Sequence, residues 1–563
     1  MKTLKKTGAI LLVQCLEAQG VEFIFGVPGA KIDSVYDALN DSSIRLIHCR
    51  HEQNAAFMAA SYGRITGKPG VVLVTSGPGV SNLATGLLTA TTEGDPVVAL
   101  GGNVSRALHL KSSHQGCDNV GLLKAATKLS VEIESDTSIS ETLIQAFRES
   151  LAPRRGAVFI SLPQDIIASP TDVEPLESPP PVLMGEAPIE LQQVLLDLLT
   201  RAKRPVILLG QGASEPTCTQ ALRAFLKRVK IPVVCTFQGA GVVSRDLIDR
   251  FFGRIGLFKN QPGDQVLDQA DLLITVGFNP VEYDPEIWNT QNQKAIVHID
   301  CLPAQVRSGY SPSLELLGDM SKTLMRLTSN IESTLAASQL NQPYSKALCA
   351  LHAALHQQLD QIHKTKNADP TTTRIHPLDF IHHLRSAIDD QTRVISDVGS
   401  HYMWLGRYFL SYEPHHLLFS NGQQTLGVAL PWAMASLLAE PHKRVISISG
   451  DGGFLFSGVE LETAVREHLP VLHFVWDDGS YNMVREQQLM KYHRDSGVKL
   501  GPVDFALFAQ SLGATGWVLE RADQIPDLLT RAQAISGPVL VHVKIDYQDN
   551  PQLFKTLHES INH

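Results

Sequence analysis

Two short acidic turns near the C-terminal end of the chain constrain its fold more than any other feature. The first, Gly450–Gly453, follows the β-run Val445–Ser449, and the second, Asp477–Ser480, follows the β-run Val471–Trp476. A helix-like stretch separates them, which predicts a parallel β-α-β unit. In such a unit the carboxyl ends of the two strands meet at one edge of the sheet, where open α/β sheets bind ligands.

The two turns supply the groups that a cation-bridged phosphate needs. Asp451 and Asp478 stand 27 positions apart (478 − 451), one in each turn. Two converging carboxylates are hard oxygen ligands for a divalent cation. A diphosphate bridged by Mg²⁺ is the simplest ligand for this site, although Gly-Asp-Gly alone also suits an ordinary turn. Three glycines leave backbone N–H groups open to phosphate: Gly450, Gly452 and Gly453.

This pattern resembles the signature of thiamine-diphosphate enzymes, in which Gly-Asp-Gly is followed by a helix and a paired Asn/Asp turn. The resemblance implies that Asp451 and Asp478 bind Mg²⁺ through their side chains and Ser480 through its carbonyl. It also assigns Tyr481 to the cofactor site. The usual pair is Asn-Asn, so Asp477-Asp478 departs from the pattern in charge. Mg²⁺ binds carboxylate at least as well as amide oxygen, so the metal tolerates the change.

The chain divides into three blocks, since 563 residues are too many for one core. The stretch 169–188 holds six prolines and 329–372 is polar, so both are expected to be connectors. We therefore expect domains over 1–170, 189–330 and 371–563. Strand and helix patterns alternate in each block, which predicts an α/β fold of three doubly wound parallel-sheet domains. The resemblance implies that they are the pyrimidine-binding, central and diphosphate-binding domains.

Composition excludes several classes of protein. A formal net charge of −9 argues against binding to nucleic acid or an anionic membrane. No apolar run approaches the roughly 18 residues of a membrane helix. Seven scattered cysteines without a C-x-x-C pair suit reduced thiols and exclude a structural zinc motif. Gln14 and Glu17 interrupt the apolar run Ala9–Val13, so we expect a cytoplasmic protein rather than an exported one.

A carboxylate in the first block is the candidate catalytic group. Glu52 follows the β-run Ile44–His48 and opens a strongly helical segment. In the family a glutamate here donates a proton to the aminopyrimidine of the cofactor, which promotes loss of the thiazolium C2 proton. The alternative is an acid that interacts with the helix dipole. The family joins the two cofactor-binding domains from different subunits, so we expect a homodimer with shared sites and a homotetramer built from it.

Two further segments resemble cofactor contacts of the family. Ser400 and His401 follow the strand Val394–Ser396 and are expected to bind diphosphate, although a histidine at a helix start is also an ordinary surface residue. Leu426 matches the apolar residue that wedges between the two cofactor rings, and Gln424 would accept a hydrogen bond through its carbonyl. A leucine at a helix entry is more often a core residue, so this assignment depends on its register.

Over essentially the whole chain, the sequence is similar to acetolactate synthases, and within them to the catabolic branch that needs no FAD. Asn279 stands where the biosynthetic branch has a flavin-contacting arginine. Gln487 stands where that branch has a tryptophan that favours 2-ketobutyrate, and Gln164 replaces the lysine of its Leu-Pro-Lys-Asp motif. The resemblance therefore implies thiamine diphosphate and Mg²⁺ as cofactors, without FAD.

The reaction implied is the decarboxylating condensation of two pyruvates to (S)-2-acetolactate and CO₂, through a hydroxyethyl group carried by the cofactor. Gln115 is the candidate hydrogen-bond donor to substrate; the alternative is a solvated loop glutamine. Gln423 replaces a methionine common in relatives, which leaves the shape of the pocket open. A pyruvate oxidase, another 2-ketoacid decarboxylase or carboligase, and a non-catalytic homologue remain as alternatives.

Overall fold

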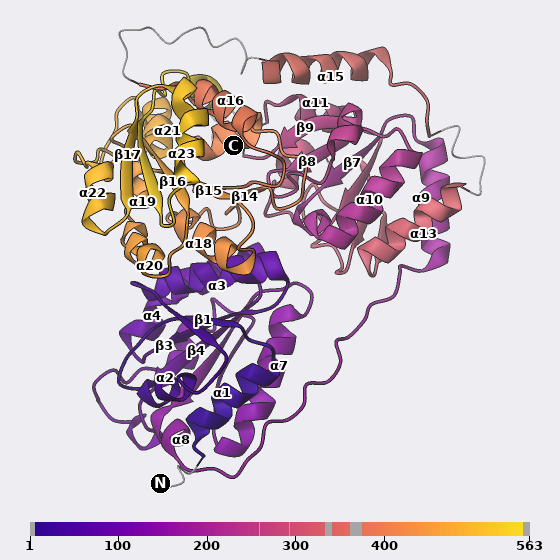
Figure 1. Ribbon diagram of the computed structural model, residues 1–563. Helices are drawn as coiled ribbons and strands as arrows, with labels where there is room; N and C mark the ends of the chain where they lie inside the picture. The colour runs from indigo at the N-terminus through magenta and orange to yellow at the C-terminus, as the bar shows by residue number, and fades with distance from the viewer. Residues whose placement is uncertain (1–5, 258, 292, 333–339, 361–373, 555–563) are drawn as a thin grey trace.

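The computed structural model describes residues 6–257, 259–291, 293–332, 340–360 and 374–554 of the chain. They form three six-stranded sheets, each covered by helices on both faces (Figure 1). Every strand pairing within the sheets is parallel. The expected α/β fold of three doubly wound sheets is therefore confirmed, because parallel strands require helical crossovers that bury both faces.

The first sheet has the strand order β2-β1-β3-β4-β6-β5. Its strands are β1 Phe23–Val27, β2 Arg45–His48, β3 Gly70–Val74, β4 Val97–Asn103, β5 Leu129–Glu132 and β6 Ala157–Pro163. Its helices are α1 Gly8–Ala18, α2 Asp33–Leu39, α3 Glu52–Thr66, α4 Pro78–Asn82, α5 Ala84–Glu93, α6 Asn119–Leu123, α7 Ile139–Leu151 and α8 Gln164–Ala168.

The third sheet repeats this topology, with the order β14-β13-β15-β16-β18-β17. Its strands are β13 Arg393–Ser396, β14 Leu417–Phe419, β15 Val445–Gly450, β16 Leu472–Asp477, β17 Thr515–Leu519 and β18 Val539–Lys544. Its helices are α16 Pro377–Ala387, α17 Ser400–Tyr408, α18 Ala429–Ala439, α19 Asp451–Phe454, α20 Leu461–Arg466, α21 Asn482–Tyr492, α22 Phe505–Ser511, α23 Ile525–Ala532 and α24 Asn550–Phe554. The 3₁₀ turn η6, Gly458–Glu460, joins α19 to α20.

The central sheet differs, because its order β12-β11-β10-β7-β8-β9 is that of dinucleotide-binding folds. Its strands are β7 Pro205–Leu209, β8 Val233–Thr236, β9 Phe251–Ile255, β10 Leu272–Val276, β11 Ala295–Asp300 and β12 Leu314–Leu317. Its helices are α9 Ile189–Arg201, α10 Pro216–Arg228, α11 Pro262–Gln269, α12 Pro285–Trp288, α13 Met320–Glu332 and α15 Lys346–Leu359. The 3₁₀ turn η3 is Gln211–Ser214.

Helices α3 and α18 pack together and join the first domain to the third (Figure 1). Residues 54–63 of α3 are buried throughout, and four of them are alanines that let the two helices approach closely. Helix α18 is apolar on nearly every side, as expected for a helix buried between two layers. One continuous apolar core therefore spans both domains.

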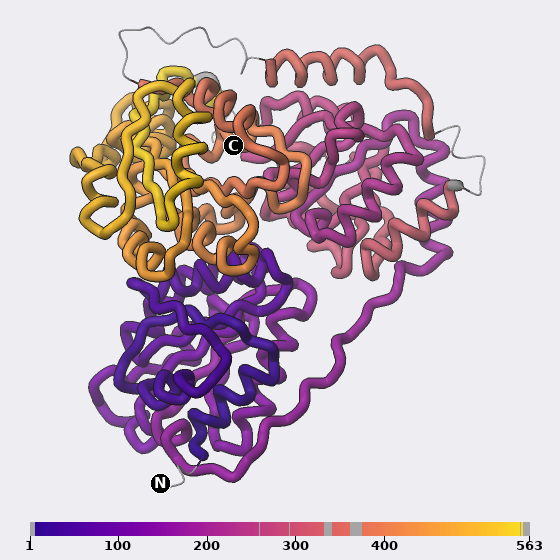
Figure 2. Tube along the Cα trace, viewed as in Figure 1, coloured from indigo at the N-terminus to yellow at the C-terminus, as the bar shows by residue number. Residues whose placement is uncertain are grey.

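The proline-rich stretch 169–188 runs along the outside of the molecule from the first domain to the central one (Figure 2). Apart from one bridge between Thr7 and Pro170, its residues form no helix or strand pairing. The second expected connector, 329–372, includes the end of α13 and all of α15, and its residues 333–339 and 361–373 lie outside the described parts. The exact domain boundaries stay a prediction.

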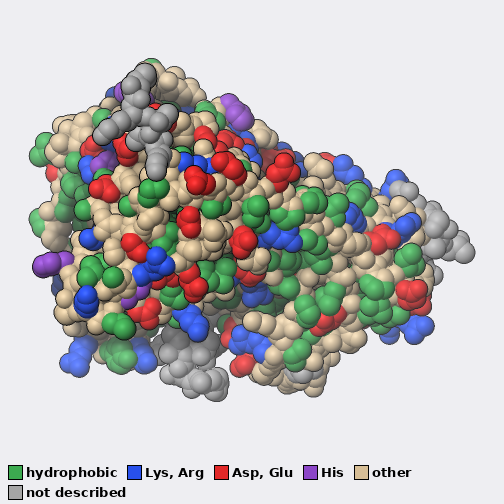
Figure 3. All heavy atoms as spheres, turned by 90° about the horizontal axis from the view of Figure 1, so that it is seen from below, with side chains coloured by type: hydrophobic (Ala, Val, Ile, Leu, Met, Phe, Trp, Pro, Cys, Tyr) green, Lys and Arg blue, Asp and Glu red, His purple; other side chains and the backbone are tan. Residues whose placement is uncertain are grey.

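The surface carries both signs of charge. On the face shown in Figure 3, Lys and Arg side chains are scattered among acidic ones. Nucleic-acid binding favours a continuous basic band instead. Across the described residues, no helix has both the length and the apolar character needed to span a bilayer.

Candidate active site

The two acidic turns lie side by side at the carboxyl edge of the third sheet. Strands β15 and β16 are parallel neighbours, and Gly450 at the end of β15 is paired in register with Trp476. Helix α19 begins at Asp451, and Asp478 directly follows β16. The backbone N–H of Gly479 donates a hydrogen bond to Asp451 Oδ2 at 2.8 Å, which ties one turn to the other.

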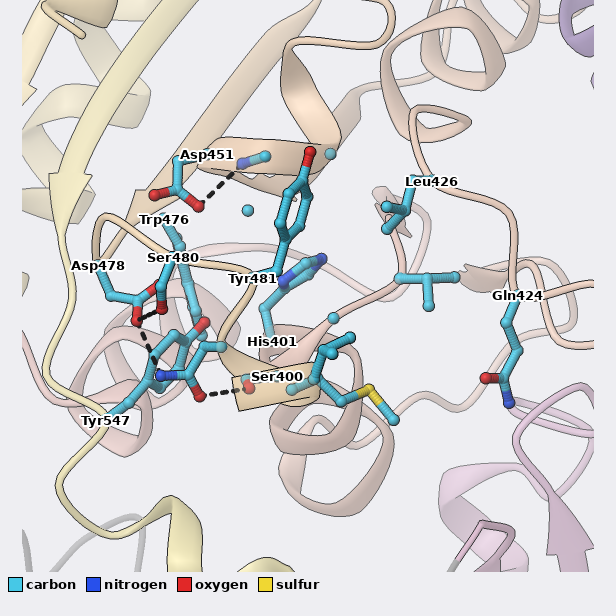
Figure 4. A pocket seen from close by; sticks show the side chains of 18 of the residues that line it. Ser400, His401, Gln424, Leu426, Asp451, Trp476, Asp478, Ser480, Tyr481 and Tyr547 are labelled. Atoms are coloured by element: carbon cyan, nitrogen blue, oxygen red, sulfur yellow. Dashed lines mark hydrogen bonds between the residues drawn. The ribbon is translucent and has the colours of Figure 1, made fainter. Parts of the chain in front are cut away.

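The Asp451 and Asp478 side chains lie on the same side of the cavity (Figure 4). Burial first, and then the facing Asp478, raises the pKa of Asp451 to about 7. Burial also raises the pKa of Asp478, whose Oδ2 accepts hydrogen bonds from Ser480 Oγ at 2.7 Å and Asn482 Nδ2 at 2.8 Å. Two buried carboxylates whose pKa values are both raised are the arrangement a bound divalent cation would stabilise. Among the described residues no cluster of three His, Cys, Asp or Glu side chains forms a metal site.

Asp477, the residue that departs from the usual asparagine, has partners on β18. His542 Nε2 lies 2.7 Å from its Oδ2, and Lys544 forms an ion pair with the same oxygen. Burial opposes ionisation of Asp477, but the hydrogen bonds from His542 and Lys544 outweigh it and lower its pKa. The extra negative charge is therefore neutralised by β18, and it is Asp478, not Asp477, that lines the cavity.

Helix α17 aims its N-terminus at the same edge. Ser400 and His401 form its first turn, and both are buried. Burial lowers the pKa of His401 to about 3, so its imidazole is neutral. Its Nε2 is buried and has no hydrogen-bond partner within the described residues, and His401 is one of the residues that line the cavity. A Cβ on Gly399 would lie 2.8 Å from the His401 ring, so a larger residue at position 399 would displace the imidazole. A helix N-terminus with an unpaired ring nitrogen suits a phosphate.

A chain of side-chain hydrogen bonds, which the sequence did not indicate, orients Asp478 and Ser400. Trp404 Nε1 donates to Asn550 Oδ1 at 2.7 Å, and Asn550 Nδ2 donates to Asn482 Oδ1 at 2.5 Å. Ser400 Oγ donates to the same Asn482 oxygen at 2.8 Å. The indole N–H can only donate, so Asn550 accepts from Trp404 with its oxygen and donates to Asn482 with its amide N–H₂. Asn482 therefore accepts with its oxygen, and its own N–H₂ donates to Asp478.

The loop before α18 forms the opposite wall. Gln424 and Leu426 both line the cavity, and Gln424 has a φ of 50°, which is uncommon for a residue other than glycine. Asp397 holds this loop, because its two oxygens accept hydrogen bonds from Gly427 N, each at 3.0 Å. Burial raises the pKa of Asp397 to about 7. Strain at a ligand-lining residue is typical of functional sites.

These walls enclose a cavity of about 240 Å³. Every candidate of the third domain lines it, together with residues not singled out from the sequence. The candidates are Ser400, His401, Gln424, Leu426, Gly450, Asp451, Gly452, Gly453, Asp478, Ser480 and Tyr481. The additional residues are Val398, Gly399, Trp476, Asn482, Met483, Val484 and Tyr547, and Gln487 is in the lining as well.

Glu52 and Gln115 lie outside this cavity, whose lining comes only from residues 398–547. Glu52 is half-buried at the start of α3, and Asn82 Nδ2 donates to its Oε2 at 2.9 Å. Gln115 is exposed, has a φ of 62° and accepts a hydrogen bond from Ser76 Oγ at 3.1 Å. The turn Gly77–Gly79 lies against both residues, so the first domain carries its own cluster of candidate residues.

A cation site, a helix N-terminus and glycine turns at parallel strand ends suit a metal-bridged diphosphate. Family comparisons identify the class. The N-terminal thiamine pyrophosphate binding domain matches residues 6–122, the central domain of the same enzymes 193–327, and their C-terminal binding domain 397–543. The chain is therefore a thiamine pyrophosphate enzyme.

Within that class the chain belongs to the acetolactate synthase family. It is 48% identical to an acetolactate synthase of Bacillus subtilis, over 98% of this chain and 95% of the relative. It is 45% identical to a catabolic acetolactate synthase of Raoultella terrigena, over 98% and 97% of the two chains. Identity to the large subunit of acetolactate synthase isozyme 2 from Escherichia coli is 33%, over 96% of each chain.

Proposed function

We propose that this protein is an acetolactate synthase that converts two pyruvate ions and one proton into 2-acetolactate and CO₂. The observation that carries the proposal is the match to named acetolactate synthases over 98% of the chain, with the paired Asp451 and Asp478 turns intact. The relative named as catabolic supports assignment to that branch. Pyruvate, as both donor and acceptor, is the substrate that this reaction requires.

The residues fit thiamine diphosphate with Mg²⁺. Asp451, Asp478 and the carbonyl of Ser480 would hold the cation. The unpaired His401 Nε2, Ser400 and the glycine N–H groups of residues 450–453 would bind the diphosphate. When bound, the cofactor supplies the electron sink that makes decarboxylation of a 2-ketoacid feasible.

Glu52 would hold the proton that activates the cofactor. Asn82 donates to Glu52 Oε2, so Oε1 is the oxygen that we assign to the shared proton. A half-buried carboxyl at this position can carry a proton in a hydrogen bond and release it again, the task of a general acid or base. Leu426, on the cavity wall, would force the two cofactor rings toward each other.

Separation of Glu52 from the cavity supports a homodimer whose sites are shared. A cavity lined only by residues 398–547 lacks the carboxylate that the reaction needs, and the first domain of a second copy would supply it. Leu88 on α5 and Leu455, Phe456 and Val459 beside α19 are 38–50% exposed, which suits surfaces covered by another subunit. A homotetramer would pair two such dimers.

Glu282 supports function without FAD. Nucleotides bind such a fold at the point where strand order reverses, here between β7 and β10. There the Glu282 carboxylate accepts hydrogen bonds from the backbone N–H groups of Gln211, at 3.0 and 3.1 Å, and of Asn279, at 3.0 Å. These are the donors that a nucleotide phosphate would need. Gly210 and Gly212 serve close packing against Gly277 instead.

One assay tests the proposal: purified protein is incubated with pyruvate, Mg²⁺ and thiamine diphosphate, with and without FAD. We expect acetolactate and CO₂ at equal rates in both samples. Acetaldehyde as the main product would indicate a decarboxylase, and FAD-dependent acetyl phosphate formation would indicate a pyruvate oxidase. All seven thiols are free, which supports function in a reducing compartment such as the cytoplasm.

A further inference from the structure

A carboxylate of the third domain holds the backbone that leads to Glu52. Glu460, the last residue of η6, is fully buried. Its Oε1 accepts hydrogen bonds from the backbone N–H groups of Arg50 at 3.0 Å and His51 at 3.1 Å, and from Asn54 Nδ2 at 3.1 Å. Its Oε2 accepts from Thr463 Oγ1 at 2.7 Å. Three of these four donors belong to the first domain and flank Glu52 on both sides.

These donors need an acceptor at this place. Helix α3 begins at Glu52 with His51 as its N-cap, so the N–H groups of Arg50 and His51 precede the helix and have no acceptor within it. A carboxylate at a helix N-terminus also interacts favourably with the helix dipole. Burial raises the pKa of Glu460, and the hydrogen bonds from Thr463, Asn54 and the two backbone groups act against this rise. Hydrogen bonds to an ionised carboxylate are stronger than those between neutral groups.

The contact joins the first and third domains of the same chain. Glu460 lies nine positions after Asp451 (460 − 451), and α19 and η6 are the elements that connect them. Figure 1 shows α20, which directly follows η6, beside α3. The Glu52 side chain is held separately by Asn82. Glu460 thus fixes the backbone of Glu52, while Asn82 orients its carboxylate.

We infer that Glu460 is a positioning residue, which sets the place of the catalytic Glu52 by binding the N–H groups of Arg50 and His51. The inference rests on the proposed role of Glu52. It assigns a catalytic consequence to a residue outside the cavity, since a displacement of about 1 Å at a reacting group can cost up to 10²-fold in rate.

The chain offers a matched control. Glu462, two residues on, pairs with the Arg50 side chain at 3.4 Å and is part-exposed. It therefore joins the same two segments at the surface without touching the backbone before Glu52. Glu460→Gln keeps the shape of the side chain but turns an amide N–H₂ toward donors. Glu462→Gln instead removes two surface ion pairs of small worth, with Arg50 and Arg466.

Two measurements test the inference. In cofactor-free protein, amide hydrogen exchange of the peptide that contains Arg50 and His51 should be at least about tenfold faster in Glu460→Gln, because a lost hydrogen bond exposes these N–H groups. In loaded protein, deuterium exchange at C2 of bound thiamine diphosphate should be about tenfold slower or more, at unchanged cofactor affinity. Glu462→Gln should behave as the wild type in both.

The outcomes separate the inference from the proposed function. Normal C2 exchange in Glu460→Gln beside slow exchange in Glu52→Gln would overturn the positioning role and leave Glu52 as the acid. Normal C2 exchange in Glu52→Gln itself would overturn both. If Glu460→Gln does not fold, Glu460→Asp keeps the charge and withdraws it by one methylene. Normal C2 exchange in that variant, at the melting temperature of the wild type, would equally overturn the inference.

Discussion

The N–H of Gly479 donates a hydrogen bond to Oδ2 of Asp451 at 2.8 Å and so joins the turn after β16 to the turn after β15. The same N–H also lies 3.0 Å from Asp477 Oδ1. One backbone group thus orients Asp451 and fixes the turn that carries Asp478. Neighbouring parallel strands end at one edge, so this geometry follows from the topology rather than from a special loop.

Asp451→Ala should abolish Mg²⁺-dependent retention of thiamine diphosphate, because the diphosphate loses its bridging cation and Gly479 loses an acceptor. Asp478→Asn should be mild, since an amide oxygen still serves Mg²⁺ and an asparagine is usual in the family. Isothermal titration of thiamine diphosphate at several Mg²⁺ concentrations measures both. Equal damage from the two substitutions would refute the assigned ligand roles.

Glu52 should act on the cofactor held by a partner subunit. Glu52→Gln and Asp451→Ala chains would each be inactive alone. When the two chains are co-expressed, each mixed dimer has one intact site out of two. Mixed dimers make up half of a statistical mixture, so the unseparated mixture should recover about a quarter of wild-type activity, and mixed dimers isolated through two affinity tags about half. The mixture would stay inactive if Glu52 served the cavity of its own chain. Glu52→Gln should also slow C2 deuterium exchange by about 10²–10⁴-fold.

The strand ends of the third domain could be predicted from the sequence. Two short apolar runs, Val445–Ser449 and Val471–Trp476, each stop at glycine and aspartate. These turn residues are typical of the carboxyl end of a buried strand. The structure extends the first by one residue, to Val445–Gly450, and shifts the second by one residue, to Leu472–Asp477. The residues at a strand end are local in sequence, so the sequence indicated the third-domain residues that line the cavity, while their binding roles stay a prediction.

Residues that act across long separations could not be predicted. Asn482 is oriented by Asn550, Asp397 holds Gly427, and Glu460 meets Arg50 in another domain. No local pattern indicates such a pairing, because hydrogen-bond partners from different elements meet only once the domains have packed. The separation of Glu52 from the cavity of its own chain was likewise expected from family resemblance alone.

Acidification should destabilise the protein partly through His416. Both ring nitrogens of His416 are buried without a hydrogen-bond partner among the described residues, and the ring packs edge-on against Phe409. Burial, and then the nearby Arg385, lowers its pKa to about 3. The unfolded chain takes up a proton near pH 6.5 and the folded one does not, so stability is lost as the pH falls below 6.5.

His416→Phe should remove this contribution. Between pH 7 and pH 5 the wild type should lose about 2 kcal/mol more stability than the variant, the linkage of one such group. Urea unfolding at both pH values measures the difference. The wild type must be compared with the variant, because Asp397 and Glu282 affect the pH dependence of stability in the opposite direction. Burial raises the pKa values of both carboxyls to about 7, so they favour the folded state as the pH falls. Identical pH dependence of the two proteins would mean that His416 is protonated in the fold.

Acceptor selectivity should depend on Gln487, which lines the cavity on α21 beside Met483 and Val484. Without a large aromatic face there, the extra methylene of 2-ketobutyrate has little to pack against, so the wild type should use it and pyruvate about equally. A methylene in a fitted pocket is worth about 1–3 kcal/mol, or 10–200-fold. Gln487→Trp should therefore shift the preference toward 2-ketobutyrate by about tenfold in a competition assay.

Lys491→Trp, one turn along the helix and exposed, is the matched control and should shift nothing. A strong preference for 2-ketobutyrate in the unmodified protein would place its specificity with the biosynthetic branch.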